Sequence, residues 1–152
     1  MGIMTLVGDD SLVINDYPIH TDFQDGDTCT IDFPNDLFSM ATGKNKNTIY
    51  AKNEAGSNFS MTFSIGIGGK VDKFLNGLRS QQESDFVRFT LMNGAFTKVL
   101  GDGEGNVTYN QYILLGMMFK KMPGAKGNSA GDTEQGKVTY VIDGAVATRG
   151  LT

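Results

Sequence analysis

The sequence predicts a mainly β protein, in which two antiparallel sheets pack as a sandwich or barrel with one flanking α-helix and a long protruding loop. Glycine and β-branched residues are abundant, with 20 Gly in 152 residues, which favours strands joined by tight turns. Apolar and polar residues alternate along several segments, the period of a half-buried strand. A parallel sheet would require strands that alternate with helices, and this sequence shows no such alternation. The length fits a single domain over 1–152.

The N-terminal segments predict a strand pair followed by a half-buried strand. Residues 11–14 end at the turn signal Asn15-Asp16, and residues 17–23 can return as the second hairpin arm, with Pro18 at a sheet edge. Residues 28–33 alternate with a period of two. Their apolar face carries Cys29, Ile31 and Phe33.

The segment from Pro34 to Ser57 is predicted to be a long, exposed excursion. Polar stretches flank the short run Thr48 to Ala51 and carry almost no apolar side chains. Loops longer than about 12 to 15 residues are uncommon in compact domains and are often functional. A protruding loop or hairpin of this size therefore needs a functional reason.

The clearest strand pattern lies at 58–68 and precedes the only helix that we expect. Apolar residues at alternate positions form a core face, and small or polar residues form the opposite face. The core face carries Phe59, Met61, Phe63, Ile65 and Ile67. After Gly68-Gly69, the residues Val71, Phe74, Leu75 and Leu78 recur at helical spacing, and the helix closes over 79–84.

The remaining chain is predicted to return to strands. Residues 85–91 alternate, with Val87, Phe89 and Leu91 inward, and Asn93-Gly94 predicts a tight turn into 95–100. A further turn at 101–106 precedes the run 107–122, where neither period is clean and a long or bent strand is favoured. Residues 124–136 predict a mobile connection, and a last strand begins at Val138 and runs towards Val146.

Composition argues against most catalytic, metal-binding and nucleic-acid-binding roles. The net charge is −4 and the basic residues do not cluster beyond Lys120-Lys121, unlike a protein that grips phosphates. Cys29 and His20 are the only cysteine and histidine, so we expect no disulfide, no metal site and no enzyme activity. We expect Cys29 to be buried as an inert thiol. We expect His20 to form a hydrogen bond at the surface. No run reaches the roughly 18 apolar residues of a membrane-spanning helix, and no signal peptide is evident, so we expect a soluble protein.

Two motifs resemble ligand sites and fail on spacing. Residues 64–71 place a strand, glycines, Lys70 and a helix in the order of a phosphate-binding loop, but Ser64 and Val71 occupy positions that need Gly and Ser or Thr. Asp102, Glu104 and Asn106 have the alternate spacing of a calcium loop without its later ligands. A strand-to-helix break and an acidic hairpin turn are the better interpretations, and no cofactor is expected.

The ordered segments DTCTIDF, GKNKNTIYAKNEAG, FSMTFSIGIGG, VDKFLNGL and KVTYVIDGAV resemble, in pattern and size, the tail tube proteins of contractile-tailed bacteriophages. The resemblance spans roughly residues 10–147. It implies a β-sandwich with a flanking helix, related in outline to the tube of type VI secretion systems. It also implies a structural virion protein that self-assembles into stacked hexameric rings, the inner tail tube through which DNA is ejected.

The resemblance also implies partners and functional residues. Expected partners are further copies of the chain, the tail sheath, the baseplate and the tape-measure protein, with DNA passing through the lumen without specific binding and no membrane contact. The loop that reaches the adjacent ring is assigned to 43–57, with Lys44, Asn45, Lys46, Asn47, Lys52 and Glu54 as its candidate residues. The candidates for the lumen face are Ser60, Thr62 and Ser64. The protein is expected in the virion tail, after assembly in the bacterial host cytoplasm.

The alternative is a small β-barrel or sandwich that binds a carbohydrate or an apolar ligand. Such modules share the strand rhythm and the lack of catalytic clusters. The absence of Trp weakens a carbohydrate platform, although five tyrosines remain as stacking candidates. These are Tyr17, Tyr50, Tyr109, Tyr112 and Tyr140.

Overall fold

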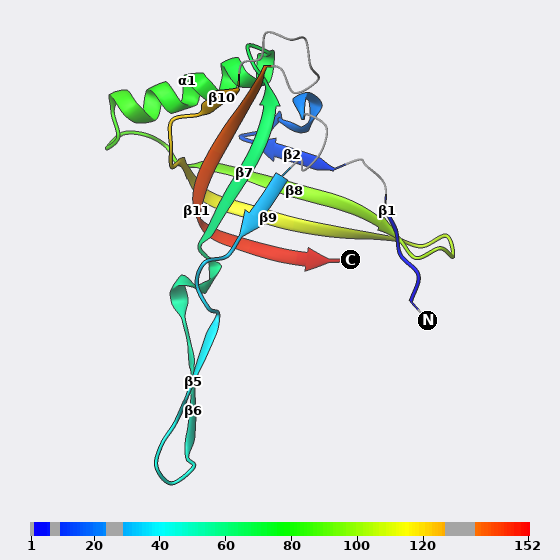
Figure 1. The fold of residues 1–152 in the computed structure, drawn as a ribbon, viewed down its shortest axis with the longest axis vertical. Coiled ribbons are helices and arrows are strands. Elements are labelled where there is room, and N and C mark those ends of the chain that lie inside the picture. Colours follow the sequence, from blue (N-terminus) through cyan, green and yellow to red (C-terminus); the bar gives the residue numbers. More distant parts are fainter. Residues whose placement is uncertain (1, 7–9, 24–28, 127–135) are drawn as a thin grey trace.

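The computed structural model describes residues 2–6, 10–23, 29–126 and 136–152, and within them it confirms a mainly β fold with one α-helix. A large antiparallel sheet forms the body, and a separate two-stranded hairpin projects from it (Figure 1). The strands of the body are β1 (Thr5–Leu6), β2 (Ser11–Ile14), β3 (Tyr17–Pro18), β4 (Cys29–Asp32), β7 (Phe59–Gly66), β8 (Met92–Gly101), β9 (Val107–Phe119), β10 (Gly124–Lys126) and β11 (Lys137–Leu151). The other elements are the short helices η1 (His20–Asp22) and η2 (Glu54–Ser57), the hairpin strands β5 (Phe38–Thr42) and β6 (Thr48–Lys52), and α1 (Lys70–Ser84).

The large sheet has the strand order β3-β2-β8-β9-β11-β7-β4, with β1 beside β8 and β10 beside β11. The 15-residue strand β11 belongs to both halves of this sheet. Its first part, 137–144, pairs with β7, and 142–151 pairs with β9. Figure 1 shows β11 bending between the two halves. Pro18 lies in β3 at one end of the strand order, as predicted.

One hydrophobic core joins both halves of the sheet to the helix. The alternation predicted along β7 is confirmed, because Phe59, Met61, Phe63 and Ile65 are all at most 2 % exposed. The helix adds Val71 and Leu75 to the core, as its spacing predicted. The other buried members are Leu12, Ile14, Ile19, Met92, Phe96, Leu114, Met117, Phe119, Val138, Tyr140 and Ile142.

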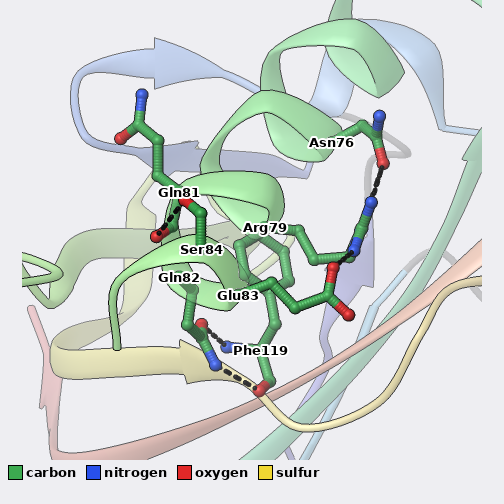
Figure 2. A network of polar contacts seen from close by, with 7 residues as sticks. All are labelled: Asn76, Arg79, Gln81, Gln82, Glu83, Ser84 and Phe119. Carbon is green, nitrogen blue, oxygen red and sulfur yellow. Dashed lines mark hydrogen bonds and ion pairs between the residues drawn. The ribbon is translucent and has the colours of Figure 1, made fainter. Parts of the chain in front are cut away.

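A hydrogen bond at each end of α1 fixes the helix to its surroundings. Near its N-terminus, Tyr140 Oη donates to Asp72 Oδ1 at 2.6 Å, and the Gly68 N–H donates to Asp72 Oδ2 at 2.8 Å. Near its C-terminus, the Gln82 side chain accepts from Phe119 N at 2.8 Å and donates to Phe119 O at 3.0 Å, as Figure 2 shows. The amide of Gln82 thus pairs with the end of β9 much as a neighbouring strand would.

The prediction of a strand at 85–91 and a turn at Asn93-Gly94 is wrong. Residues 85–91 form a turn and a loop, and Val87, expected inward, is 92 % exposed. Asn93-Gly94 lies inside β8 at a register shift in the pairing with β9. There the Asn93 side chain accepts from Gly116 N at 3.1 Å, and two β9 residues, Leu115 and Gly116, lie opposite Asn93. The bulge therefore belongs to β9, where Gly116 has φ +68°, and the dipeptide forms no hairpin turn.

Smaller differences concern the ends of predicted strands. The hairpin arm expected over 17–23 is a strand only at β3, followed by η1 and a single bridge from Phe23 to Ile65. Phe33, expected on the core face, is 42 % exposed, and Ile67 lies beyond the end of β7 and is 53 % exposed. Of the connection expected at 124–136, the first residues form β10, and 127–135 lie outside the described residues.

Candidate assembly surfaces

The hairpin β5–β6 forms the protruding excursion predicted between Pro34 and Ser57. Its strands pair from Phe38 opposite Lys52 to Thr42 opposite Thr48, and every residue of both strands is exposed. Figure 1 shows it extending away from the body, with no other element beside it. A two-stranded hairpin without a covered face is only marginally stable in water. The hairpin is therefore a surface suited to contact with another molecule.

The six residues assigned to the inter-ring loop lie along this excursion. Lys44, Asn45, Lys46 and Asn47 form the tip, where Gly43 N donates to Asn47 O at 2.8 Å. Lys52 ends β6, and Glu54 begins η2 at the hairpin base. The structure therefore separates the four tip residues from the other two by the length of β6.

The hairpin also carries exposed apolar side chains, and the sequence analysis did not predict these as contact residues. The register places Phe38, Met40 and Tyr50 on one hairpin face, and they are 66 %, 62 % and 74 % exposed. Ile49, on the other face, is 69 % exposed. The sequence does contain a sign of these apolar faces, because Ile49 and Tyr50 are adjacent in a short strand and must lie on opposite faces of it. Exposed apolar residues on both faces indicate a surface that contacts another molecule.

The two ends of the hairpin are closed against each other at its base, beside β9 and β11. Asn53 N donates to Leu37 O at 2.8 Å, and Asn35 Nδ2 donates to Ala55 O at 3.1 Å. At Gly56 a Cβ atom would come within 2.7 Å of Leu37 Cα, so only glycine fits this close approach. A cavity of about 460 Å³ lies at this joint and includes Phe33, Leu37, Tyr112 and Arg149 in its wall.

The lumen candidates share the outer face of β7, opposite the core. Ser60 and Ser64 are half-buried and Thr62 is exposed. The register places Thr30 and the apolar Val141 on either side of Thr62, and Thr139 beside Ser64. Ser64 Oγ and Thr139 Oγ1 are 2.9 Å apart and share a hydrogen bond. We call this surface, the outer face of β4, β7 and β11 around Thr62, the polar face.

Two carboxylates join the polar face at one end. Asp32 and Asp143 are both opposite Ser60 in the register, on either side of β7. Lys120, which carries the opposite charge, lies near this end, in the wall of a neighbouring cavity of about 680 Å³ that also includes Asp32 and Asp143. The remainder of the polar face around Thr62 is uncharged.

Among the margins of the large sheet that have no described strand beside them are one side of β4 and one side of the C-terminal part of β11. β4 pairs with β7 on one side, and no described strand pairs with its other side. The C-terminal part of β11, 145–151, pairs with β9, but β7 ends its pairing at Gly144. Each margin leaves backbone N–H and C=O groups that a strand from another chain can satisfy.

The unclear periodicity of 107–122 now has a physical explanation. Leu114 and Met117 of β9 are fully buried, whereas Ile113 and Leu115 point to the other face and are 47 % and 44 % exposed. Val146 of β11, opposite Leu115, is 40 % exposed. Both faces of β9 are therefore apolar, and a strand with two apolar faces shows neither a clean alternation nor a helical period.

The residues considered for chemistry have structural roles. Burial raises the pKa of the Cys29 thiol to about 12, with a smaller contribution from the charge of Asp10, so Cys29 is not a thiolate at neutral pH. His20 Nδ1 lies 3.3 Å from Leu12 O, a local hydrogen bond of the kind predicted. Gly68, with φ +75°, marks the predicted break between β7 and α1.

The acidic turn at 101–106 uses its carboxylate internally. Asp102 accepts hydrogen bonds from Glu104 N at 2.7 Å, Asn106 N at 3.1 Å and Asn106 Nδ2 at 2.7 Å. These bonds, that of the Asn106 side chain first, lower the pKa of Asp102. The geometry is that of a hairpin turn, and within the described residues no three His, Cys, Asp or Glu side chains lie together as a metal site would require.

The five tyrosines considered for a carbohydrate platform do not form one. Tyr140 is 1 % exposed, and Tyr17 stacks on Phe74 with ring centroids 4.2 Å apart. Tyr50 lies on the hairpin, and Tyr109 and Tyr112 lie on opposite faces of β9. Within the described residues, no helix is long and apolar enough to cross a membrane.

Comparison with known proteins identifies the fold. No protein-family model and no curated protein matches the chain. A chain of the sheath-tube complex of an extracellular contractile injection system, PVC, in its extended state matches with a TM-score of 0.62 and 6 % identity, over 96 % of this chain and 90 % of that one. The tube-terminating cap of the anti-feeding prophage matches with a TM-score of 0.61 and 10 % identity, over 94 % of this chain and 88 % of that one. The chain therefore has a contractile tail tube-like fold, which confirms the resemblance at the level of the fold.

Proposed function

We propose that the chain is a structural, non-enzymatic subunit of a phage-type contractile tail tube. In this proposal residues 1–152 form a single tail-tube-like domain that assembles into hexameric rings, and the rings stack into the conduit for DNA ejection. Similar structures come from a sheath-tube complex and a tube cap, which supports a sheath as an outer partner. The baseplate and the tape-measure protein complete the proposed partners. The protein acts in the virion tail, after assembly in the bacterial host cytoplasm.

The observation that carries this proposal is the pair of open sheet margins. β4 and 145–151 each lack a described strand on one side, although both belong to a well-packed sheet. Identical copies arranged around a rotation axis can join one margin to the other, and a closed ring then leaves no free edge. Such a ring converts an aggregation hazard into a defined assembly.

The hairpin β5–β6 provides the second contact that a tube needs. Rings joined through their margins still require an interaction along the axis, and an exposed, projecting hairpin can reach a neighbouring ring. Its apolar residues Met40, Tyr50 and Ile49 would be covered there, while Lys44 and Lys46 meet an acidic surface. Asn45, Asn47, Lys52 and Glu54 complete the proposed inter-ring residues.

The polar face is the proposed lining of the lumen. Small hydroxyl side chains at Ser60, Thr62 and Ser64 offer DNA neither apolar patches nor positive charge. Asp32 and Asp143 add negative charge, which repels phosphates within about 8 Å at physiological salt. A lining of this kind lets a polyanion pass without retaining it.

Negative-stain imaging of the purified chain at high concentration tests the proposal. We expect rings and stacked tubes, whereas the alternative binding module predicts monomers or small closed oligomers. Thr62→Arg tests the lumen assignment, because a ring of cations facing the channel should retain DNA that the wild-type tube releases. Ser80→Arg, on an exposed position of α1, is the matched control and should leave DNA retention unchanged. Monomers at every concentration would overturn the tube function.

A further inference from the structure

The turn between β8 and β9 forms an exposed end that combines apolar side chains with negative charge. Residue Thr5 pairs with Gly101, and a Cβ atom on Gly103 would lie 3.2 Å from Ile3 Cγ2, so the N-terminal segment lies against this turn. Ile3, Met4, Leu6 and Val107 are each more than half exposed. We call these four residues, with Asp102 and Glu104, the acidic end.

The charge of the acidic end is negative and available. The carboxylate oxygens of Asp102 accept hydrogen bonds within the turn, so Asp102 adds negative charge to this end while Glu104 is the carboxylate left to face a partner. Glu104 is an exposed residue that contributes only its backbone N–H to the hydrogen bonds of the turn. A partner surface that covers the exposed apolar side chains would therefore have to provide positive charge beside them.

The opposite end of β8 combines apolar side chains with positive charge. Phe86, Val87 and Met122 are 61 %, 92 % and 64 % exposed. A groove of about 320 Å³ has Phe86, Phe119, Lys120, Lys121 and Met122 in its wall. We call Phe86, Val87, Lys120, Lys121 and Met122 the basic end.

The two lysines dominate the electrostatics of the groove. Arg79 also lines it, but its guanidinium is paired with Glu83 at 2.6 Å and bonded to Asn76, as Figure 2 shows. Arg88 is paired with Asp85 in the same loop. Lys120 and Lys121 form no ion pair with any described residue. Lys120 also lines the cavity that includes Asp32 and Asp143, whereas Lys121 does not, so Lys121 provides most of the positive charge available to a carboxylate from outside.

The two ends cannot meet within one chain. They lie at opposite ends of the 10-residue strand β8, a separation of about 30 Å at roughly 3.3 Å per residue. Figure 1 shows the α1–β8 loop on one side of the body and the β8–β9 turn on the other. A second copy, in contrast, presents an acidic end to the basic end of the first.

We propose that the acidic end of one copy docks on the basic end of the next, with Glu104 facing Lys120 and Lys121. The contact is heterologous, because it joins two different patches, and such contacts generate rings or filaments. Apolar residues on both sides become buried together, and the opposite charges fix the register. This inference rests on the proposed function, for which it names a contact between neighbouring subunits.

Charge reversal tests the contact. Lys120→Glu with Lys121→Glu should reduce the polymer recovered by sedimentation at least about tenfold, and Glu104→Lys should do the same, because like charges then face each other. Combining all three changes in one chain should restore polymer to within about twofold of wild type. Lys70→Glu with Lys73→Glu, on exposed positions at the other end of α1, makes the same charge change and should leave the polymer intact. Circular dichroism checks that each variant is folded.

The outcomes separate this contact from the tube function. If wild-type chain forms tubes and the reversals leave them unchanged, the contact is wrong and the tube function stands. Failure of the combined variant to recover polymer, with all variants folded, also overturns the contact. If wild-type chain forms no polymer, the proposed function itself is wrong.

Discussion

Removing the hairpin should separate folding from stacking. We would delete Phe38–Lys52 and join Leu37 to Asn53 through Gly-Gly. The join is short because Asn53 N already donates to Leu37 O at 2.8 Å, so the two residues are strand neighbours. A two-residue glycine turn suits this geometry. The body, including η2 and the cavity at the hairpin base, remains intact.

The structure sets the expected magnitude. Both hairpin strands are exposed throughout, so the deletion removes no residue from the core. Loop closure favours the shortened chain by about 0.6 kcal/mol per halving of loop length, or about 2 kcal/mol when roughly 15 residues become two. Hydrogen bonds within the hairpin offset part of this gain. We therefore expect the free energy of unfolding to stay equal or rise by up to about 2 kcal/mol, which corresponds to a rise in Tm of up to about 8 °C.

Urea denaturation and negative-stain imaging together measure the result. The shortened chain should unfold cooperatively and form isolated rings, while wild-type chain forms stacks. A second variant, Met40→Ser with Tyr50→Ser, keeps the hairpin and its basic tip but removes apolar surface, and should weaken stacking to an intermediate degree. Normal tubes from the shortened chain would show that the hairpin is not the inter-ring element. A misfolded product would show that the hairpin contributes to the body, contrary to its exposure.

Four further outcomes test the structure. Phe63→Asp should abolish folding through an unpaired buried charge, whereas Thr62→Asp on the polar face should fold, as judged by circular dichroism; a folded Phe63→Asp chain would contradict the facing of β7. Tyr140→Phe removes the bond to the Asp72 carboxylate and should lower the free energy of unfolding by about 1.5 to 3 kcal/mol in urea titrations, an unchanged value being inconsistent with that bond. Cys29, with its raised pKa, should react with a disulfide reagent at pH 8 far more slowly in the native than in the unfolded chain, and labelling at equal rates would refute its burial. Because folding lowers the pKa of Asp102, the ionised carboxylate stabilises the fold above pH 3.8, its ordinary pKa, and this stabilisation fades as the pH falls through the lowered pKa. Asp102→Asn should therefore have a lower free energy of unfolding than wild type at pH 7, and the difference between the two proteins should be smaller at pH 3.

Local sequence patterns predicted the elements whose burial follows a single period. The strand at β7 and the helix at α1 each have one apolar face, so alternation in one and three-and-four spacing in the other sufficed. The excursion around β5–β6 was predicted from its polar flanks. What the pattern did not predict is which surfaces of these elements meet other molecules, because that depends on contacts outside the chain.

The failure at 85–94 has a physical cause that sequence periodicity does not register. Alternation at 85–91 fits a strand, but no described strand lies beside it, and Asp85 instead accepts from Arg88 N at 3.3 Å in a local turn. Asn-Gly favours two-residue hairpin turns because such turns need positive φ, which neither Asn93 nor Gly94 adopts here. Here Asn93 bonds both Asn15 and Gly116, which are distant in sequence, and those tertiary partners hold the dipeptide inside β8, opposite the bulge at Gly116 in β9.

The core and the candidate assembly surfaces use different residues, and this separation explains how the fold can persist at very low identity. Matching structures share 6 % and 10 % of residues with the chain yet align over more than nine tenths of it. A core tolerates wide substitution when volume and alternation are kept, as between β7 and α1. The hairpin contributes no residue to that core, and β8 contributes only Met92 and Phe96 among its described residues. The exposed surfaces of such a scaffold can change in charge and shape between chains that share the fold without loss of folding, so a shared fold does not by itself transfer contact residues from one chain to another.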